Sequence, residues 1–336
     1  MKKTLTVLKY LLFLFIGVGL LWLTFRHQSP FEIIERIGHA DLKWIGVSLL
    51  LSILALISRS YRWNLLIHPL GYRPKLMNTF HSLMIGYFAN LAIPRIGEIS
   101  RCAALNKAEH VPFDKLIGTV IVERVSDVVM LIISIILVLA IEYERLGGFL
   151  YQHLFAPAIA SFKNSEIIII ITIFILIAAC FFIYSYFKNH KGSNLSKKIK
   201  SLTAGIIAGL KSIVKMRSRG AFVFHSFFIW IMYFLMTYTC FHALKSTEAL
   251  DAKAGLLIMV IGGIAMSAPV QGGIGTYHFL VSQALLLYGI DNSSGIVFAT
   301  MVHTWQMIIC IVFGLIGWLA IFVFSKNKVN GASQKN

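Results

Sequence analysis

Long uncharged runs alternate along the chain with short segments that hold most of its charged side chains. The runs cover residues 10–25, 44–58, 76–94, 128–141, 167–187, 221–244, 254–290 and 292–325. Because about 20 consecutive apolar residues let a helix cross a bilayer, the pattern predicts an all-α polytopic integral membrane protein. Run 44–58 is short, and Arg59 and Arg62 are expected to snorkel at its end. Run 128–141 needs the preceding helical turn to reach spanning length.

The first run follows three lysines, as the apolar core of a signal peptide would. It ends in Leu-Thr-Phe-Arg-His, however, with no small-residue cleavage site. We therefore expect this segment to be a retained first span.

Positive charge in the connecting segments predicts which side of the membrane each one faces, because Lys and Arg are enriched in cytoplasmic loops. The connecting segments fall into two groups by their content of Lys and Arg. The rich group has 23 of the 31 Lys and Arg residues and consists of the N-terminus, 59–78, 95–115, 188–219 and the tail from Lys326. The poor group, with seven, is 26–43, 142–166 and 245–253. The rich group, with both termini, is predicted to be cytoplasmic in a bacterial-type inner (plasma) membrane.

This assignment requires two runs to enter the membrane and return to the same side. Both neighbours of 76–94 are predicted to be inside, and both neighbours of 254–290 outside. The order is then span, span, hairpin, span, read twice in opposite orientations, which is the sequence sign of an inverted repeat. We expect one transmembrane domain over 1–336, with six full spans and two re-entrant or short-helix hairpins. Its halves are about 1–145 and about 163–326.

The two expected hairpin tips share the pattern Pro-x-x-Gly, at Pro94 to Gly97 and at Pro269 to Gly272. Pro and Gly break helices, and backbone groups freed at membrane depth must be satisfied by protein or by a water-filled cavity. A packing kink is the alternative explanation. The matching positions in two inverted halves favour a central site.

Composition agrees with a membrane protein and argues against other classes. The 336 residues are 57% hydrophobic and 13% charged, whereas soluble domains have about 25% charged residues. The net charge of +17 lies in segments between apolar runs, so it is read as orienting charge and no nucleic-acid partner is expected. The four cysteines lie in or beside apolar runs without metal-ligand spacing, so neither a disulfide nor a metal site is expected.

The densest polar cluster lies at the first tip and the start of the following span. Its members are Arg95, Glu98, Arg101, Glu123, Arg124 and Asp127. An unpaired charge at membrane depth costs about 2.5–3.5 kcal/mol, so these three cations and three anions are expected to form one connected network. The network, with Asn90 nearby, is predicted to contact a headgroup phosphate or to fix the hairpin by buried salt bridges, and both roles can hold together.

The second tip supplies Gln271, Gly272, Gly273, Gly275 and His278 as candidate substrate-binding residues. Glycines before a helix start expose backbone N–H groups that suit a phosphate, although glycines also permit close helix packing. His278, with His303 and Gln306, could relay a proton or bond a headgroup. A structural hydrogen bond is the alternative for each.

Catalytic signatures are missing from the sequence. It has no Walker sequence, no His-Glu-x-x-His and no serine nucleophile elbow. The basic segment 188–219 is too short to form a catalytic domain. We therefore predict no catalytic residues and no cofactor.

Four motifs extend from about the second span to the last. They are Tyr61-Arg-Trp63, Asn90-x-x-x-Pro-Arg-x-Gly-Glu-x-x-Arg101, Glu123-Arg-x-x-Asp127 and Pro269-x-x-Gly-Gly-Ile-Gly275. Together they resemble the lysylphosphatidylglycerol synthase transmembrane (flippase-like) family. The resemblance implies movement of a phospholipid across the bilayer, which is an aminoacylated phosphatidylglycerol in bifunctional members. Lysine transfer is not expected, because the soluble transferase domain of those members is not seen. Thr276-Tyr-His278 stands where the family suggests an acidic residue.

The sequence leaves three functional hypotheses open. The first, which we favour, is a translocator for an anionic phospholipid, an aminoacyl-phospholipid or a polyprenyl-phosphate-linked lipid, with such membrane lipids as its partners. The second is an integral-membrane enzyme acting on a lipid-linked phosphate or sugar, with carboxylates from Glu98, Glu123 and Asp127. The third is a non-catalytic membrane partner for a cytoplasmic enzyme that docks on 188–219. A homo-oligomer is a further candidate assembly.

Overall fold

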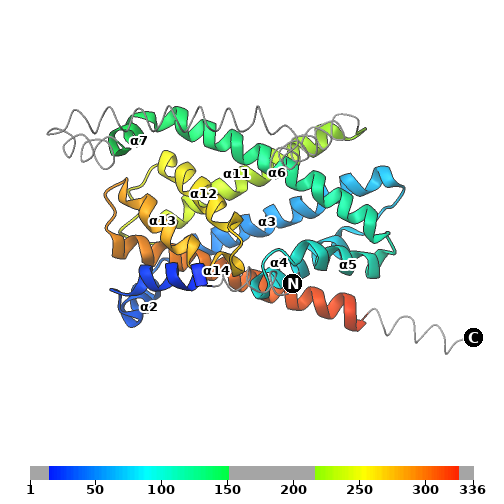
Figure 1. The fold of residues 1–336 in the computed structure, drawn as a ribbon, viewed down its shortest axis with the longest axis horizontal. Coiled ribbons are helices and arrows are strands. Elements are labelled where there is room, and N and C mark those ends of the chain that lie inside the picture. Colours follow the sequence, from blue (N-terminus) through cyan, green and yellow to red (C-terminus); the bar gives the residue numbers. More distant parts are fainter. Residues whose placement is uncertain (1–14, 151–215, 325–336) are drawn as a thin grey trace, which may run out of the picture.

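The computed structural model describes residues 15–150 and 216–324, and every regular element within these ranges is helical (Figure 1). A helix at Phe15–Phe25 comes first. The first half continues with α2 Pro30–Gly38, α3 Leu42–Ile67, η1 His68–Leu70, α4 Leu76–Ala92, α5 Gly97–Glu109, α6 Phe113–Ile141 and α7 Tyr143–Leu150. The second half contains α11 Arg219–Phe241, α12 Ala252–Ser267, η3 Gln271–Gly273, α13 Thr276–Leu286, α14 Asn292–Trp318 and η4 Leu319–Phe324.

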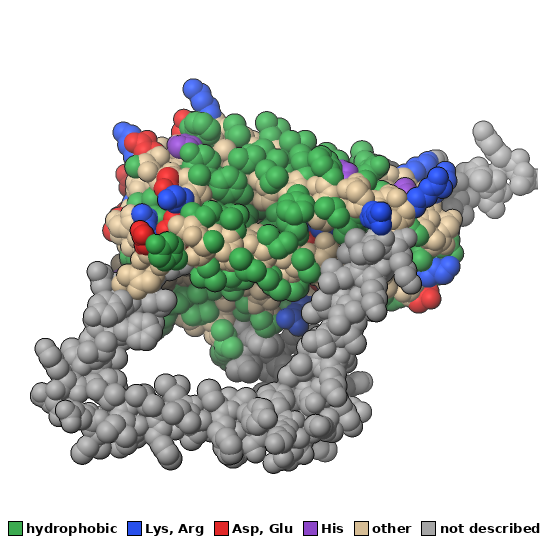
Figure 2. Space-filling model, turned by 90° about the horizontal axis from the view of Figure 1, so that it is seen from above, with side chains coloured by type: hydrophobic (Ala, Val, Ile, Leu, Met, Phe, Trp, Pro, Cys, Tyr) green, Lys and Arg blue, Asp and Glu red, His purple; other side chains and the backbone are tan. Residues whose placement is uncertain are grey.

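Within the described residues, 4 helices are long and apolar enough to cross a membrane. They are Leu42–Leu70, Phe113–Ile141, Arg219–Phe241 and Asn292–Phe322. The apolar helices Phe15–Phe25 and Ala252–Ser267 are shorter. On the face shown in Figure 2, hydrophobic side chains cover the middle of the molecule and charged side chains gather toward its two ends. The chain therefore folds as a multi-pass α-helical membrane protein.

Two pairs of helices form the hairpins expected around Pro94 and Pro269. Because α2 lies near one end of the bundle and α5 near the other (Figure 1), we name these the α2 end and the α5 end. The α4–α5 hairpin enters from the α5 end, and the α12–α13 hairpin enters from the α2 end. The arms of the first hairpin meet backbone to backbone, since a Cβ on Gly97 would overlap the carbonyl oxygen of Gly86.

The two hairpin tips contact each other in the interior. A Cβ on Gly272 would lie 3.0 Å from the Cδ2 of Leu91 near the first tip, and α4 contacts η3. Gly272, Gly273 and Gly275 have φ angles of 55°, 75° and 84°, which glycine adopts without steric cost. These glycines let the second tip reverse direction where it packs against the first.

The long helices surround the two hairpins. α3 packs along α11, and these two form the most extensive helix pair among the described elements. α6 contacts α12 and α5, whereas α14 contacts α13 and α4. The hairpins are therefore each held against both α6 and α14.

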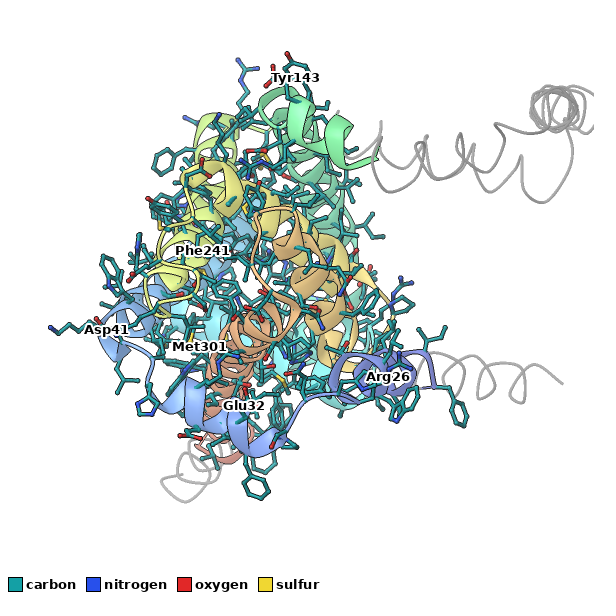
Figure 3. The ribbon with its side chains drawn as sticks, turned by 90° about the vertical axis from the view of Figure 1, so that its left-hand side faces the viewer. Arg26, Glu32, Asp41, Tyr143, Phe241 and Met301 are labelled. Atoms are coloured by element: carbon teal, nitrogen blue, oxygen red, sulfur yellow. The ribbon has the colours of Figure 1, made fainter. Side chains whose placement is uncertain are left out.

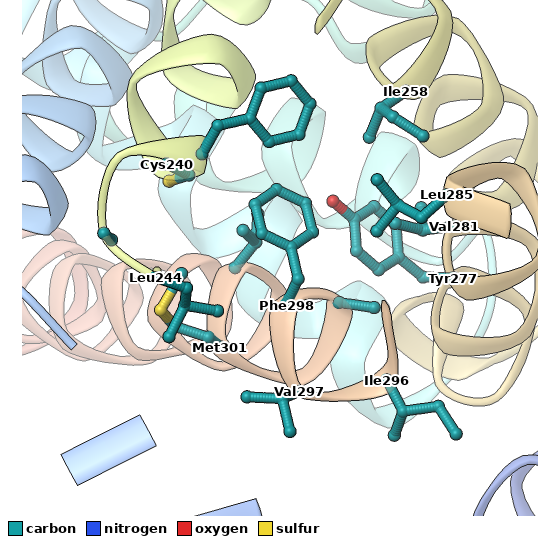
Figure 4. Close-up of a cluster of buried hydrophobic side chains, with 14 of the residues drawn as sticks. Cys240, Leu244, Ile258, Tyr277, Val281, Leu285, Ile296, Val297, Phe298 and Met301 are labelled. Carbon is teal, nitrogen blue, oxygen red and sulfur yellow. The ribbon is translucent and has the colours of Figure 1, made fainter. Parts of the chain in front are cut away.

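The largest hydrophobic cluster joins α11, α12, α13 and α14 (Figure 4). Phe241 and Phe298 pack with their ring centroids 5.2 Å apart, and Tyr277 is 5% exposed in the same cluster. Viewed from the α2 end, Figure 3 shows Phe241 and Met301 in the interior and Tyr143 at the periphery. This cluster fixes the second hairpin against α14.

The expectation that Arg59 and Arg62 snorkel is wrong. The uncharged run ends at Ser58, but α3 continues to Ile67. Arg59 and Arg62 lie within the helix and are 5% and 0% exposed, because carboxylates of α6 face them inside the protein. The expected span 167–187 lies outside the described residues, so the total of six spans stays a prediction.

Candidate functional site

Two carboxylates on α6 form the centre of a buried charged network. Glu123 and Asp127 lie one helical turn apart, near the middle of the Phe113–Ile141 helix. Their side chains are 1% and 15% exposed. Two like charges at this spacing repel each other, and burial removes the water that would stabilise them. Cations are therefore required close by.

α3 provides two of these cations. Arg59 Nη2 donates to Glu123 Oε1 at 2.8 Å and to Asp127 Oδ2 at 2.9 Å. Arg62 Nη2 donates to Asp127 Oδ1 at 2.6 Å and lies 3.8 Å from Glu123. Sequence reasoning did not include either arginine among the site residues. Their spacing of three residues, which places them on one helix face, was the signal that could have identified them.

α5 and α6 complete the network. Arg101 Nη1 donates to both carboxylate oxygens of Glu123, at 3.3 Å and 3.2 Å. Arg124 lies 3.4 Å from Glu98 and 4.0 Å from Asp127. The Arg124–Glu98 pair forms the rim of the network, since these side chains are 45% and 28% exposed.

Five of the six charged residues predicted to form one network are thus joined by ion pairs, and Arg95 is the exception. Glu98 and Arg101 are three residues apart on one face of α5. Arg95 precedes that helix, at the tip, with a φ of 65°. Its side chain is exposed, and it forms no ion pair within residues 15–150 and 216–324. It therefore does not share the face that meets α6.

The network carries more positive than negative charge. The four arginines that form it face three carboxylates, which leaves an excess of one positive charge. The prediction of three cations balanced by three anions is wrong, because α3 adds two arginines and Arg95 lies outside. The side chains of Arg59, Arg62 and Arg101 are 6%, 0% and 2% exposed, so bulk ions screen the excess only weakly.

Aromatic side chains hold the guanidinium groups in place. Arg101 lies over the ring of Trp63, 4.6 Å from its centroid, and Trp63 Nε1 donates to Thr119 Oγ1 at 2.8 Å. Arg59 Nη1 donates to the hydroxyl of Tyr233 on α11 at 3.0 Å. Stacking together with in-plane hydrogen bonds restricts a guanidinium strongly. The positive charge is therefore held in a fixed position.

A small cavity borders the network at the first hairpin. Its volume of about 10 Å³ has room for about one water molecule. The cavity is lined by Leu83, Gly86, Tyr87, Asn90, Gly97, Glu98, Arg101 and Arg124. Two of these lining residues have a buried side-chain atom, Arg101 Nη2 and Glu98 Oε2, without a hydrogen-bond partner in the part of the chain that the structure describes. Because an unpaired buried polar atom is costly, a polar ligand group at this cavity would be stabilised.

Asn90 has a structural contact at the same cavity. Its Oδ1 accepts a hydrogen bond from the backbone N–H of Gly97 at 2.7 Å. Gly97 begins α5, and the first N–H groups of a helix have no partner within the helix. Asn90 therefore joins the end of α4 to the start of α5 and positions Arg101.

The candidate residues of the second tip lie together around η3. Gln271, Gly272 and Gly273 form this short helix. The N–H of Gly275 donates to His278 Nδ1 at 3.4 Å, and a Cβ on Gly275 would overlap the carbonyl oxygen of Gly17 in the first described helix. In this conformation Gly275 permits close packing, and phosphate binding by the tip glycines stays a prediction.

Comparison with known proteins shows which family this chain resembles. The sequence model described as the lysylphosphatidylglycerol synthase TM region matches residues 7–314. The chain is 31% identical to the UPF0104 membrane protein MJ1595 of Methanocaldococcus jannaschii over 142 residues, which cover 41% of this chain and 42% of that protein. It is 23% identical to the UPF0104 membrane protein PH1989 of Pyrococcus horikoshii over 302 residues, 85% of this chain and 89% of that protein. No solved structure matches. The chain thus belongs to the lysylphosphatidylglycerol synthase transmembrane-region family.

Proposed function

We propose that this protein is a membrane lipid translocator, and that the anionic headgroup of its cargo passes between the two hairpin tips. The observation that carries the proposal is the excess positive charge buried beside the first hairpin. Arg101 is one of the residues that line the cavity there, and its buried Nη2 has no hydrogen-bond partner among the described residues. A phosphate group would supply the missing negative charge and accept hydrogen bonds from the guanidinium.

The packing of the helices supports an inverted repeat, as expected of such a translocator. α3 lies along α11, and the two hairpins enter from opposite ends. α6 contacts α12 of the other half, and α14, which corresponds to α6, contacts α4, which corresponds to α12. The same contact is therefore made twice, once from each half. We infer two inverted halves, an architecture in which transporters hold cargo near the membrane midplane.

The distribution of basic residues supports an orientation with the α5 end in the cytoplasm. Segments 59–78 and 95–115 turn at that end, and segment 188–219, which leads to α11, has nine basic residues and no acidic one. Cytoplasmic segments are enriched in Lys and Arg. The arginine network then lies in the cytoplasmic half, where a headgroup from the inner leaflet would meet it first.

The described conformation is closed around the network. The cavity holds about one water molecule, whereas small-molecule sites have volumes of about 300 Å³ or more. A headgroup can therefore enter only when the hairpins move apart. We propose that separation of the two tips is the step that admits the cargo.

Purified protein in liposomes tests the proposed function. Fluorescent phosphatidylglycerol and phosphatidylcholine are followed by quenching with a membrane-impermeant reductant, and the wild type is expected to move phosphatidylglycerol faster. Arg101→Gln should slow phosphatidylglycerol about tenfold or more, because a lost contact to a buried charge is worth about 2 kcal/mol or more. Arg145→Gln is the matched control, since Arg145 pairs with Glu142 at 3.5 Å near the α2 end. It should leave the rate unchanged.

Other outcomes would contradict the proposal. Equal movement of both lipids by the wild type, or a wild-type rate for Arg101→Gln, would show that the headgroup site lies elsewhere. A covalent change in the extracted lipid, detected by mass spectrometry, would identify an enzyme. If the protein neither moves lipid nor forms a product, the result would favour a non-catalytic membrane partner.

A further inference from the structure

Two buried histidines face each other behind the second hairpin tip. His278 is on α13 and His303 is on α14, and they are 6% and 2% exposed. Their ring centroids are 4.9 Å apart, with the rings inclined by 71°. Neither ring belongs to the arginine network, so the roles proposed above do not account for this pair.

Both rings form hydrogen bonds with the backbone of the second tip, and both bonds can form when the rings are neutral. His303 Nε2 lies 2.8 Å from the carbonyl oxygen of Gly272, which requires a proton on that nitrogen. His278 Nδ1 accepts from the N–H of Gly275 at 3.4 Å, which requires a lone pair on that nitrogen. These assignments follow from the partners, and each ring keeps a second nitrogen that can gain or donate a proton.

Among the described residues, the side chains that contact the pair are uncharged. From α13, Tyr277 stacks on His303 at 5.2 Å, and Cys240 of α11 packs in the same cluster as Tyr277. From the first described helix, Phe25 lies 5.6 Å from His278. No carboxylate, Lys or Arg hydrogen-bonds to either ring within the described ranges. A proton taken up here would therefore add net positive charge to an uncharged site.

The histidine pair is linked directly to the contact between the two tips. His303 donates a hydrogen bond to the carbonyl oxygen of Gly272, and Gly272 packs against Leu91 of the first tip. A proton on Nδ1 of His278 would remove the acceptor of the Gly275 N–H. A charge on either ring would also repel a charge on the other. The protonation state of the pair and the separation of the tips are therefore coupled.

We propose that the His278–His303 pair is a proton-binding site that couples headgroup movement to protons. In the closed conformation both rings are neutral. When the tips separate, water reaches the pair, and one ring nitrogen takes a proton from hydronium, which leaves as water. The resulting positive charge at the second tip receives the anionic headgroup that leaves the arginine network. On closure the proton returns to water. This coupling rests on the translocator function proposed above.

Substitutions that preserve the backbone hydrogen bonds test this coupling. In His303→Gln the side-chain amide can still donate to the Gly272 carbonyl, and in His278→Asn the side-chain oxygen can still accept from the Gly275 N–H. Phosphatidylglycerol movement is measured in liposomes at about pH 6 and about pH 8, where an unperturbed histidine changes charge. The wild-type rate should differ at least about threefold between these pH values, and the double variant should lose that difference. His39→Gln, at an exposed histidine of the α2 end, should retain it.

A second measurement separates failure of the coupling from failure of the translocator function. The ¹⁵N shifts of His278 and His303, assigned by comparison with the two variants, report protonation of each ring in the purified full chain. Lipid movement by the wild type without pH dependence would overturn the coupling and leave the translocator standing. If no lipid moves, the proposed function fails. In that case, absence of any proton uptake by the pair down to about pH 5, both in the wild type and in Leu91→Ala, which removes the side chain that Gly272 packs against, would overturn the proton site as well.

Discussion

At the scale of single residues, Glu123 is the most deeply buried carboxylate of the network, with only 1% of its side chain exposed. It accepts hydrogen bonds from Arg59 and Arg101 and lies 3.8 Å from Arg62. Arg59 and Arg62 also pair with Asp127, whereas Arg101 pairs with no carboxylate other than Glu123 among the described residues. Loss of the Glu123 carboxylate would leave the buried Arg101 without an ion-pair partner, and breaking a buried ion pair on one side only is strongly destabilising.

Glu123→Gln is therefore expected to lower the free energy of unfolding by about 3–5 kcal/mol. Thermal unfolding of the purified protein in detergent measures the change. Glu32→Gln provides the control, because Glu32 pairs with Arg36 at 4.0 Å on the surface and exposed pairs contribute about 0–1 kcal/mol. Equal losses of stability in the two variants would contradict a structural role for the buried network.

Arg101→Gln should behave differently from Glu123→Gln. It removes one of several cations around Glu123, which keeps Arg59 at 2.8 Å. We expect membrane yield close to that of the wild type and a destabilisation smaller than that of Glu123→Gln, while phosphatidylglycerol movement slows about tenfold or more. If Arg101→Gln is as unstable as Glu123→Gln, the arginine serves the fold rather than the cargo.

Arg59 and Arg62 show why the sequence predicted only part of the network. Runs of uncharged residues define spans well, but this criterion ends a span at its first arginine. α3 continues past Ser58 because its arginines meet carboxylates more than 60 residues later in the chain. Such a long-range partner leaves no local signal. Glu98 and Arg101 were found because they lie in the same dense motif as the tip.

At the scale of elements, the first hairpin depends on close approach of its two arms. Gly86 and Gly97 bring α4 and α5 into backbone contact, and a Cβ on Gly86 would lie 2.7 Å from the carbonyl oxygen of Gly97 and 3.0 Å from the Cβ of Arg101. The crossing point therefore places Arg101 between α4 and the α6 carboxylates. Loop charge and the shared Pro-x-x-Gly were enough to predict both hairpins, but not this crossing point.

Gly97→Ala should force the two arms apart and destabilise the protein by about 1–3 kcal/mol, as overpacking does. Gly46→Ala is the matched control on α3, because a Cβ there meets nothing within 4 Å. This control should be neutral or stabilising by about 0.5–1 kcal/mol, since Ala is favoured over Gly inside a helix. Thermal unfolding of both variants checks the prediction, and similar stabilities would rule out a tight crossing at Gly97.

At the scale of the whole molecule, the proposed orientation places the two ends of the bundle on opposite sides of the membrane. Single cysteines in a cysteine-free background can be labelled in intact cells with an impermeant maleimide. Glu144→Cys and Lys245→Cys should be labelled from outside, whereas Ser193→Cys in the basic segment should be protected. Labelling of Ser193→Cys from outside would reverse the orientation and place the arginine network in the outer half.

The sequence predicts the overall architecture more completely than it predicts the site, for a physical reason. Each apolar run must match the thickness of the bilayer, so the spans are encoded locally. The meeting of Leu91 with Gly272 depends on how two hairpins pack across the interior, and only the shared Pro-x-x-Gly pointed to it. The inverted repeat as a whole stays a proposal, and the expected first span of its second half, at 167–187, lies outside the described residues.

Reversible joining of the two tips tests the central claim most directly. Leu91→Cys and Gly272→Cys are combined in a cysteine-free background, since these positions contact each other and a disulfide needs Cα atoms about 4.4–6.8 Å apart. Oxidation should stop phosphatidylglycerol movement in liposomes, reduction should restore it, and each single-cysteine variant should be insensitive to both. Unchanged movement by the fully cross-linked protein would show that the headgroup does not pass between the hairpins.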